Sequence, residues 1–297
     1  MTLDVSLQTV TLPNGETISY REAGSGKKVI ILIHGNMSSS KHWDVVMERL
    51  QDSYKLFAID LRGFGFSSYN EPIESLRDFS EDLLQFVKQV GIRSFSLVGW
   101  STGGGVSMQF ASNYPQFVEQ LILIESVGIK GYPILKKDEL GQPIAGQFLS
   151  SKEEIAKDPI QVLPVLKALE KRDKEFYRML WNHLIYTQNQ PNNEKYDEYI
   201  EDMFTQRNLV DVDYALVTFN ISNETNGVTN GTGEIYQITA PTLVLQGDRD
   251  YVVPQAMGEE IANTIQQAKF VLLRNCGHSP LVDCLEELIQ HIKAFIS

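Results

Sequence analysis

Ser101 lies in a five-residue pattern that is typical of a nucleophilic serine. The sequence Gly99-Trp100-Ser101-Thr102-Gly103 matches G-x-S-x-G, in which the serine occupies a strained turn between a strand and a helix. The apolar residues 95–98 predict the strand, and residues 102–114 predict the helix. Such a serine would be exposed beside a helix N-terminus, where developing negative charge is favoured. The alternative is a glycine-rich turn around a buried, inert serine.

His278 is the candidate general base for this serine. A serine hydroxyl is a weak nucleophile and needs a base, which is usually a histidine. Of the five histidines, His278 follows a predicted strand and immediately precedes the last predicted helix. We expect His34 to fix the shape of its loop by hydrogen bonding rather than to move a proton. The other three lie at the start of a helix, in the middle of the chain and within the last helix: His42, His183 and His291.

Asp250 is the candidate acid that would orient the imidazole of His278. A general-base histidine needs a carboxylate that fixes its tautomer and stabilises the imidazolium. Asp248 and Asp250 both follow a predicted strand. We prefer Asp250, because Asp248 could instead form a local ion pair or cap the turn. A third candidate is Glu125, at the end of another predicted strand.

The loop at residues 34–36 is expected to complete an oxyanion hole. Acyl transfer creates an oxyanion, which is stabilised by preorganised N–H donors. One donor should be the backbone N–H of Thr102, directly after the nucleophile, and the other should be that of Asn36, after an earlier strand. We expect the substrate to contact three larger side chains near these residues and in the middle segment: Met37, Trp100 and Trp181.

The segments that must position these residues alternate between strand and helix. Residues 29–33 are a continuous apolar run, typical of a strand buried on both faces of a parallel sheet. Residues 75–90 carry apolar side chains at helical spacing. Further strands are predicted at residues 54–59, 95–98, 117–124, 241–246 and 269–273, and a hairpin at residues 6–22. The pattern predicts an α/β fold with a mostly parallel, doubly wound sheet.

The alternation stops between residues 126 and 238. This segment predicts helices without strands between them, at residues 151–156, 159–171, 174–185 and 194–208, and then a polar loop at residues 220–233. We therefore expect a core domain made of residues 1–125 and 239–297, with a helical cap inserted as residues 126–238.

Composition narrows the class of protein. The 297 residues carry a formal net charge of −12, which disfavours nucleic acid and anionic membrane surfaces as partners. No secretory signal is evident at residues 1–8, and the two cysteines are too few for a disulfide framework. We expect a soluble cytoplasmic protein that acts on a small molecule, with a homodimer as an open possibility.

Taken together, these motifs resemble the α/β-hydrolase superfamily. The matching segments are His34-Gly35, Asp60-Leu61-Arg62-Gly63-Phe64-Gly65-Phe66-Ser67, Gly99-Trp100-Ser101-Thr102-Gly103-Gly104, the Gly247/Asp250/Val253-Pro254 pattern and Gly277-His278. The glycine run after Ser101 is similar to the carboxylesterase and haloperoxidase-perhydrolase branch. Because Ser101 replaces the nucleophilic aspartate of haloalkane dehalogenases and epoxide hydrolases, the resemblance disfavours those two reactions. In the segment at residues 60–67 we expect Arg62 to form local ion pairs.

The resemblance implies hydrolysis of a small to medium carboxylic ester through an acyl-enzyme on Ser101. No metal or organic cofactor is expected, since the triad and oxyanion hole suffice for this chemistry. Two alternatives remain open on this sequence. One is a lactonase or carbon–carbon bond hydrolase with the same residues, and the other is a ligand-binding, receptor-like homologue with slow turnover.

Overall fold

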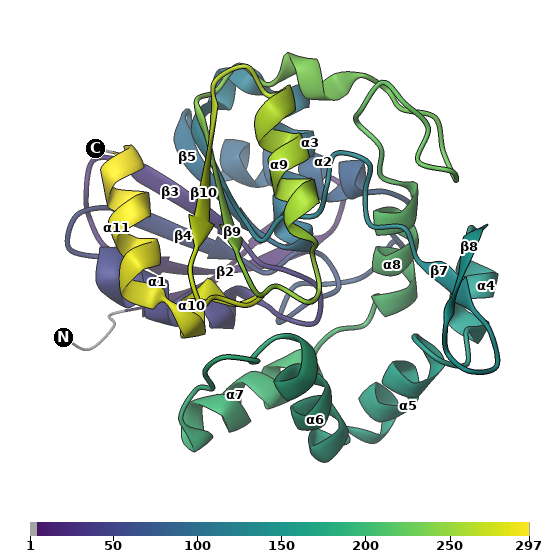
Figure 1. Cartoon of the computed structure of the whole chain (residues 1–297). Coiled ribbons are helices and arrows are strands. Elements are labelled where there is room, and N and C mark those ends of the chain that lie inside the picture. The colour runs from purple at the N-terminus through teal and green to yellow at the C-terminus, as the bar shows by residue number, and fades with distance from the viewer. Residues whose placement is uncertain (1–4, 297) are drawn as a thin grey trace.

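An eight-stranded sheet forms the centre of the computed structural model, which describes residues 5–296 (Figure 1). The strands are Val5–Thr11 (β1), Thr17–Ala23 (β2), Val29–Ile33 (β3), Lys55–Ile59 (β4), Phe95–Trp100 (β5), Val118–Ile124 (β6), Thr242–Gly247 (β9) and Ala268–Leu273 (β10). Their order in the sheet is β1-β2-β4-β3-β5-β6-β9-β10. β2 pairs antiparallel with β1 and β4, and the strands from β4 to β10 pair in parallel. The predicted, mostly parallel sheet is confirmed.

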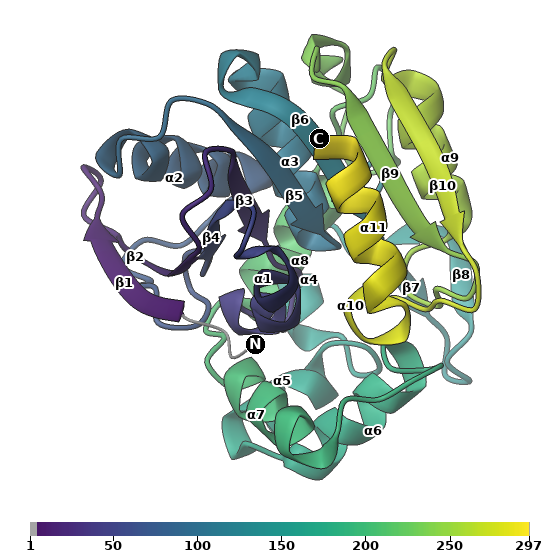
Figure 2. The same cartoon turned by 90° about the vertical axis from the view of Figure 1, so that its left-hand side faces the viewer.

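Helices cover both faces of this sheet. They are Asp44–Leu50 (α1), Leu76–Gln89 (α2), Thr102–Asn113 (α3), Gln255–Thr264 (α9), Pro280–Asp283 (α10) and Leu285–Ile296 (α11), with short 3-10 turns at Ser40–Trp43, Pro115–Phe117 and Glu234–Gln237. One apolar core joins Ile31 to α2, α3 and α9, and a second joins Ile30 to α1 and α11. Successive residues of β3 thus face opposite cores, which is why that strand is apolar throughout. Figure 2 views the sheet from the side of α1 and α11.

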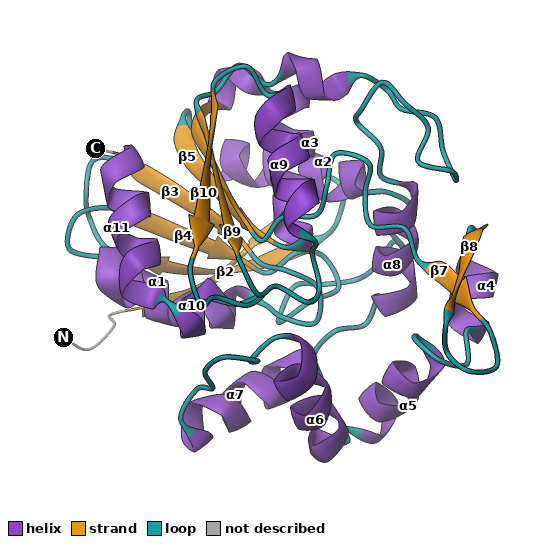
Figure 3. Cartoon of the chain, in the orientation of Figure 1, coloured by secondary structure: helices purple, strands orange, loops and turns teal. Residues whose placement is uncertain are grey.

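The segment between β6 and β9 lies outside the sheet (Figures 1 and 3), and its helix at residues 209–218 packs into the same apolar core as α2 and α3. It contains Leu135–Lys137 (β7), Pro143–Phe148 (β8), Lys152–Lys157 (α4), Leu163–Lys171 (α5), Lys174–Leu184 (α6), Asn193–Met203 (α7) and Leu209–Thr218 (α8). The expectation that this segment lacks strands is wrong, because β7 and β8 pair as an antiparallel hairpin. Both strands are short and only partly buried, so they lack the apolar alternation that would have indicated them. Across residues 5–296, no helix is both long and apolar enough to cross a membrane.

The predicted helix at residues 194–208 is also wrong at its C-terminal end. α7 ends at Met203, and a new helix, α8, begins at Leu209. The intervening turn is fixed by the loop after β4: the backbone N–H of Arg207 donates to the carbonyl of Gly63 (2.9 Å), and Asn208 Nδ2 donates to the carbonyl of Arg62 (2.7 Å). Contacts between segments so far apart in the sequence end the helix, and local periodicity does not encode them.

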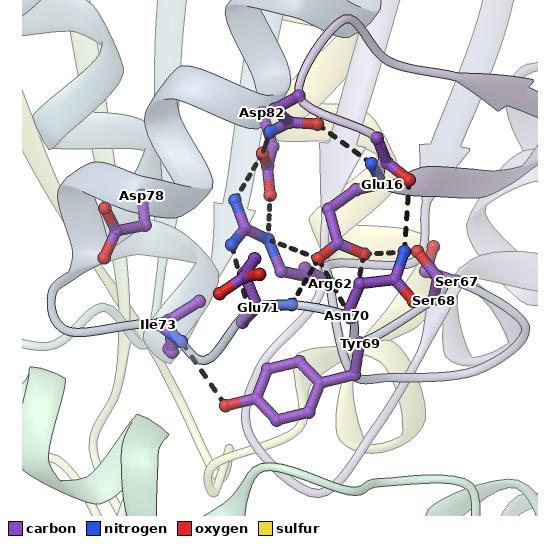
Figure 4. Close-up of polar contacts among 12 residues, drawn as sticks. Glu16, Arg62, Ser67, Ser68, Tyr69, Asn70, Glu71, Ile73, Asp78 and Asp82 are labelled. Carbon is purple, nitrogen blue, oxygen red and sulfur yellow. Dashed lines mark hydrogen bonds and ion pairs between the residues drawn. The ribbon is translucent and has the colours of Figure 1, made fainter.

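Arg62 connects the loop after β4 to α2 (Figure 4). Its guanidinium donates two hydrogen bonds to Asp82 on α2, from Nε (2.7 Å) and Nη2 (2.6 Å). Glu16 lies beside it and accepts hydrogen bonds from the backbone N–H groups of Asn70 and Glu71. A bidentate arginine–carboxylate pair fixes the orientation of the guanidinium as well as its distance from the carboxylate. The expected local ion pairing of Arg62 is confirmed.

Candidate active site

The strand order reverses between β3 and β5, and the candidate site lies at this point. β4 lies on one side of β3 and β5 on the other, so the chain continues in opposite directions from the sheet centre. In open α/β sheets, ligands bind at the carboxyl ends of strands where the order reverses. Gly35 and Asn36 follow β3, and Ser101 follows β5. The topology therefore brings the predicted nucleophile and the predicted oxyanion loop together.

Ser101 has the strained backbone that its motif predicts. Its φ and ψ angles are 56° and −120°, a conformation that costs on the order of 1–3 kcal/mol outside glycine. Its backbone N–H donates to the carbonyl of Ile124 on the neighbouring strand (2.9 Å), which holds the turn. Gly103 lets the helix start directly against the sheet, since a Cβ there would lie 2.3 Å from the carbonyl oxygen of Ile33.

Ser101, His278 and Asp250 form a continuous hydrogen-bonded series. Nε2 of His278 lies 3.0 Å from Oγ of Ser101, and its Nδ1 lies 2.8 Å from Oδ2 of Asp250. Trp100 Nε1 donates to the backbone carbonyl of His278 (2.8 Å), which fixes the loop that carries the imidazole. The side chains of His278 and Asp250 are 4% and 1% exposed, so the pair is shielded from water.

Asp250 is held in its ionised form. Burial alone would raise the pKa of its carboxyl, but the adjacent His278 and several hydrogen-bond donors outweigh burial and hold that pKa below its ordinary value. Two of these donors are the backbone N–H groups of Val252 and Val253, which bond Oδ1 at 2.7 and 2.9 Å. A carboxylate ionised in this way can stabilise an imidazolium at His278.

His34 shapes the loop after β3, as expected. The backbone N–H of Leu61 donates to its Nε2 (3.0 Å), so Nδ1 carries the proton and donates to the carbonyl of Gly35 (2.7 Å). Burial lowers the pKa of His34 to about 4, which keeps the ring neutral and compatible with both bonds. His34 therefore links the loops after β3 and β4.

The other histidines and carboxylates considered as base or acid do not take part in the hydrogen bonds that join Ser101, His278 and Asp250. His42 is buried and stacks on Tyr199, with ring centroids 4.2 Å apart. His183 is exposed on α6, and His291 lies on α11 near Glu287. Asp248 accepts a hydrogen bond from the backbone N–H of Cys276 and forms an ion pair with Arg274 (3.8 Å). Glu125 accepts hydrogen bonds from Gln246 and from the backbone N–H of Gly247, whereas His278 contacts Asp250.

The predicted oxyanion loop presses against the serine. A Cβ added to Gly35 would lie 3.0 Å from Cβ of Ser101, so only glycine fits without displacement. Asn36 is fixed by side chains of the inserted segment: its Nδ2 donates to Asp213 (3.2 Å), and its Oδ1 accepts from Gln206 (2.7 Å). Thr102 is the first residue of α3, where a backbone N–H has no partner within the helix.

A cavity of about 220 Å³ opens onto Ser101. All three predicted substrate contacts, Met37, Trp100 and Trp181, line it. The remaining lining residues are mostly apolar and come from the loop after β3, the inserted segment, the loop after β9 and the loop after β10: Gly35, Asn36, Gln161, Val165, Leu180, Leu184, Ile185, Val252 and His278. Within residues 5–296, no cluster of His, Cys, Asp or Glu could hold a metal ion.

A family model described as the alpha/beta hydrolase fold matches residues 28–283. The chain belongs to this family. The matched range begins just before β3 and ends just after His278, so it contains every segment of the site described above.

Among the relatives of this α/β hydrolase is Lipase 1 of Psychrobacter immobilis, 27% identical over 303 aligned positions that cover 99% of this chain and 85% of the relative. Lipase 3 of Moraxella sp. (strain TA144) is 25% identical, and the alignment covers 98% of this chain and 85% of the relative. A crystal structure of a putative lipase from Acinetobacter baumannii has a TM-score of 0.76 at 24% identity, covering 98% of this chain and 91% of that one. This last similarity supports the fold.

Sequence reasoning missed most of the cavity wall in this α/β hydrolase. Leu184 lies three residues after Trp181 and four residues after Leu180 on α6, so helical spacing could have indicated that these side chains lie together. Gln161, Val165 and Ile185 carry no comparable signal, because their places depend on how the inserted segment folds over the sheet. The supporting residues Gln206 and Asp213 were missed for the same reason.

Proposed function

We propose that this chain is a serine esterase in which Ser101, His278 and Asp250 act as a catalytic triad. The observation that carries the proposal is the series Ser101 Oγ to His278 Nε2 (3.0 Å) and His278 Nδ1 to Asp250 Oδ2 (2.8 Å). It begins at a strained serine at the mouth of a cavity. This is the geometry of nucleophile, base and orienting acid that activates a serine.

In the proposed reaction, His278 removes the proton of Ser101 as Oγ attacks the ester carbonyl. The backbone N–H groups of Thr102 and Asn36 stabilise the oxyanion. Collapse of the tetrahedral intermediate breaks the bond to the alcohol, which leaves with the proton from His278. Water then attacks the acyl-enzyme with His278 again as base, which releases the acid and restores Ser101. Asp250 stays ionised and stabilises the imidazolium in both halves.

The cavity supports a small to medium ester as substrate. Its volume is about 220 Å³ and its lining is mostly apolar, which suits an acyl chain. We propose that residues 126–238 are a cap over a core of residues 1–125 and 239–297, because α5 and α6 supply one wall and the core supplies the reacting groups. The names of the two lipases of Psychrobacter and Moraxella support ester hydrolysis as the reaction class.

Replacing Ser101→Ala is expected to abolish turnover of p-nitrophenyl acetate and butyrate. Loss of the nucleophile of a triad lowers kcat by roughly a million-fold, in effect to background. Purified wild type and variant are compared by release of p-nitrophenol and by labelling with a fluorophosphonate, which should mark only the wild type. Ser112→Ala is the matched control, since this buried serine lies on α3, the helix that follows Ser101, and donates its hydrogen bond to the carbonyl of Met108. Equal ester turnover in wild type and Ser101→Ala would refute the proposed function.

A further inference from the structure

Glu125 is a buried carboxyl group that the proposed mechanism does not use. It directly follows β6, its side chain is wholly buried, and its backbone has a positive φ of 45°. A non-glycine residue in this region is strained, and a buried carboxyl group is costly unless it is well bonded. Its backbone N–H donates to the carbonyl of Leu245 on β9, so the strained turn is held against the strand that leads to Asp250.

Both oxygens of Glu125 are bonded to the end of β9. Oε1 accepts a hydrogen bond from the backbone N–H of Gly247, and Oε2 accepts one from Nε2 of Gln246, each at 2.7 Å. The same Nε2 donates to the carbonyl of Val253 (3.1 Å) and lies 3.4 Å from Oδ2 of Asp250. Glu125 therefore holds the start of the loop at residues 247–253 directly, through Gly247, and the end of that loop indirectly, through Gln246. This loop carries Asp250.

The carboxyl groups of Glu125 and Asp250 both meet Nε2 of Gln246, which donates to Oε2 of Glu125 (2.7 Å) and lies 3.4 Å from Oδ2 of Asp250. Each carboxyl group shifts the pKa of the other, and because two bare carboxylates this close together repel, a proton on one of them is favoured. Asp250 already accepts hydrogen bonds from Val252, Val253 and His278, which favour its charged form. Burial and the nearby Asp250 raise the pKa of Glu125 well above its ordinary value. The proton therefore resides on Glu125.

We propose that Glu125 is a positioning residue: as a neutral carboxylic acid it donates a hydrogen bond to Asp250 and fixes that carboxylate in the orientation that His278 requires. The proposal rests on the proposed function, in which Asp250 is the acid of the triad. In this role Glu125 does not contact the substrate. Because it is neutral, it also adds no negative charge beside His278.

Two substitutions separate a neutral donor from a second charge. Glu125→Gln keeps an acceptor for Gly247, supplies an amide donor to Asp250 and carries no charge at any pH. Its amide nitrogen replaces Oε2 beside Nε2 of Gln246, so the hydrogen bond from Gln246 is lost in this variant, while Gln246 keeps its bond to the carbonyl of Val253. Glu125→Ala removes the donor altogether. Each variant is assayed for kcat, KM and the pH dependence of kcat/KM on p-nitrophenyl butyrate.

We expect Glu125→Gln to keep kcat within a few-fold of wild type, with the acid limb of kcat/KM within about 0.3 pH units. Removing a true negative charge beside His278 would instead move that limb to lower pH, because the charged imidazolium would lose a stabilising neighbour. Glu125→Ala should lower kcat by about tenfold to a hundredfold with KM nearly unchanged, since misplacement of a catalytic group costs rate and not binding. A downfield proton resonance from Nδ1 of His278 should persist in Glu125→Gln and shift in Glu125→Ala.

Three results would overturn the positioning role: full kcat in Glu125→Ala, loss of more than tenfold in Glu125→Gln, or movement of its acid limb by more than about 0.5 pH units. If Glu125→Ala does not fold, the positioning role is tested by Glu125→Gln alone, through its kcat and the acid limb of its kcat/KM profile. Ser101→Ala is assayed in parallel. Full activity in Glu125→Ala beside an inactive Ser101→Ala would reject this inference alone, whereas an active Ser101→Ala would reject the proposed function.

Discussion

Asp213 shows how a single side chain near the site links stability to pH. It lies on α8 and binds Asn36 of the proposed oxyanion loop. Burial raises the pKa of its carboxyl to about 7 from 3.8, and the hydrogen bond from Asn36 offsets only part of that rise. Between these two values the folded chain keeps a proton that the unfolded chain has released. Its contribution therefore favours folding at low pH and is lost as the pH rises through about 7.

We expect Asp213→Asn to stabilise the fold progressively as the pH rises. The amide keeps the acceptor for Asn36 but never ionises, so its advantage over wild type should grow by about 2 kcal/mol between pH 5 and pH 8. Urea unfolding at each pH measures this difference. The exposed substitution Asp52→Asn serves as the control, and its difference from wild type should stay constant. An advantage for Asp213→Asn that shrinks with rising pH would have the wrong sign for a raised pKa.

For single residues, the sequence predicted which side chains meet at the candidate site better than it predicted the groups that support them. Ser101, His278 and Asp250 each follow a strand that could be located from its apolar run, and parallel strands end at one edge of the sheet. Their proximity therefore follows from the topology. The pairing of Glu125 with Asp250 depends on side-chain directions at the ends of β6 and β9, which no pattern of residue types specifies.

Among the elements, α3 is constrained most tightly, because it begins in contact with the sheet. A Cβ at Gly103 would lie 2.3 Å from the carbonyl oxygen of Ile33 and 2.5 Å from that of His34. Both are backbone atoms of the strand and loop beneath the helix, so neither can turn aside as a side chain would. The methyl group would have to push α3, together with Ser101, away from β3.

Gly103→Ala is expected to lower the free energy of unfolding by about 3 kcal/mol or more. Gly128→Ala is the matched comparison, since its Cβ would meet the flexible side chain of Met257 at 3.2 Å and should cost about 1 kcal/mol or less. Denaturant unfolding followed by circular dichroism gives both values. Similar free energies of unfolding for the two variants would contradict this prediction, because they would show that α3 can shift away from β3 at little cost.

Core elements were predicted closely, whereas the inserted segment was predicted only in part: α4 and α6 lie within one residue of the predicted helices at residues 151–156 and 174–185. β3, β4 and β9 were expected to within about two residues, since strands covered on both faces are marked by continuous apolar runs. The β7–β8 hairpin and α8 were not predicted. The hairpin is half-exposed, and α8 starts where contacts to the loop after β4 end the preceding turn. Such contacts between distant segments leave no local signature.

For the molecule as a whole, the cavity is lined both by the sheet and its loops and by the segment inserted between β6 and β9. The core contributes Ser101, His278 and the loop at residues 35–37, while α5 and α6 contribute apolar side chains. In the proposed reaction the core supplies the reacting groups, so we expect the length and shape of an acceptable acyl chain to depend on the wall that the inserted segment supplies. Changes in that wall should alter selectivity among esters and leave the reactivity of Ser101 intact.

Leu184→Trp should shift this selectivity toward short esters. The larger side chain would fill part of the cavity of about 220 Å³, so kcat/KM for p-nitrophenyl octanoate should fall by about tenfold or more, whereas that for the acetate should change little. Met179→Trp is the control on the same helix, because Met179 is 62% exposed on the outer surface. Steady-state kinetics over a series of chain lengths measures the effect. A parallel loss on all esters would mean that the substitution disturbs Ser101, and an unchanged series would place the acyl chain elsewhere.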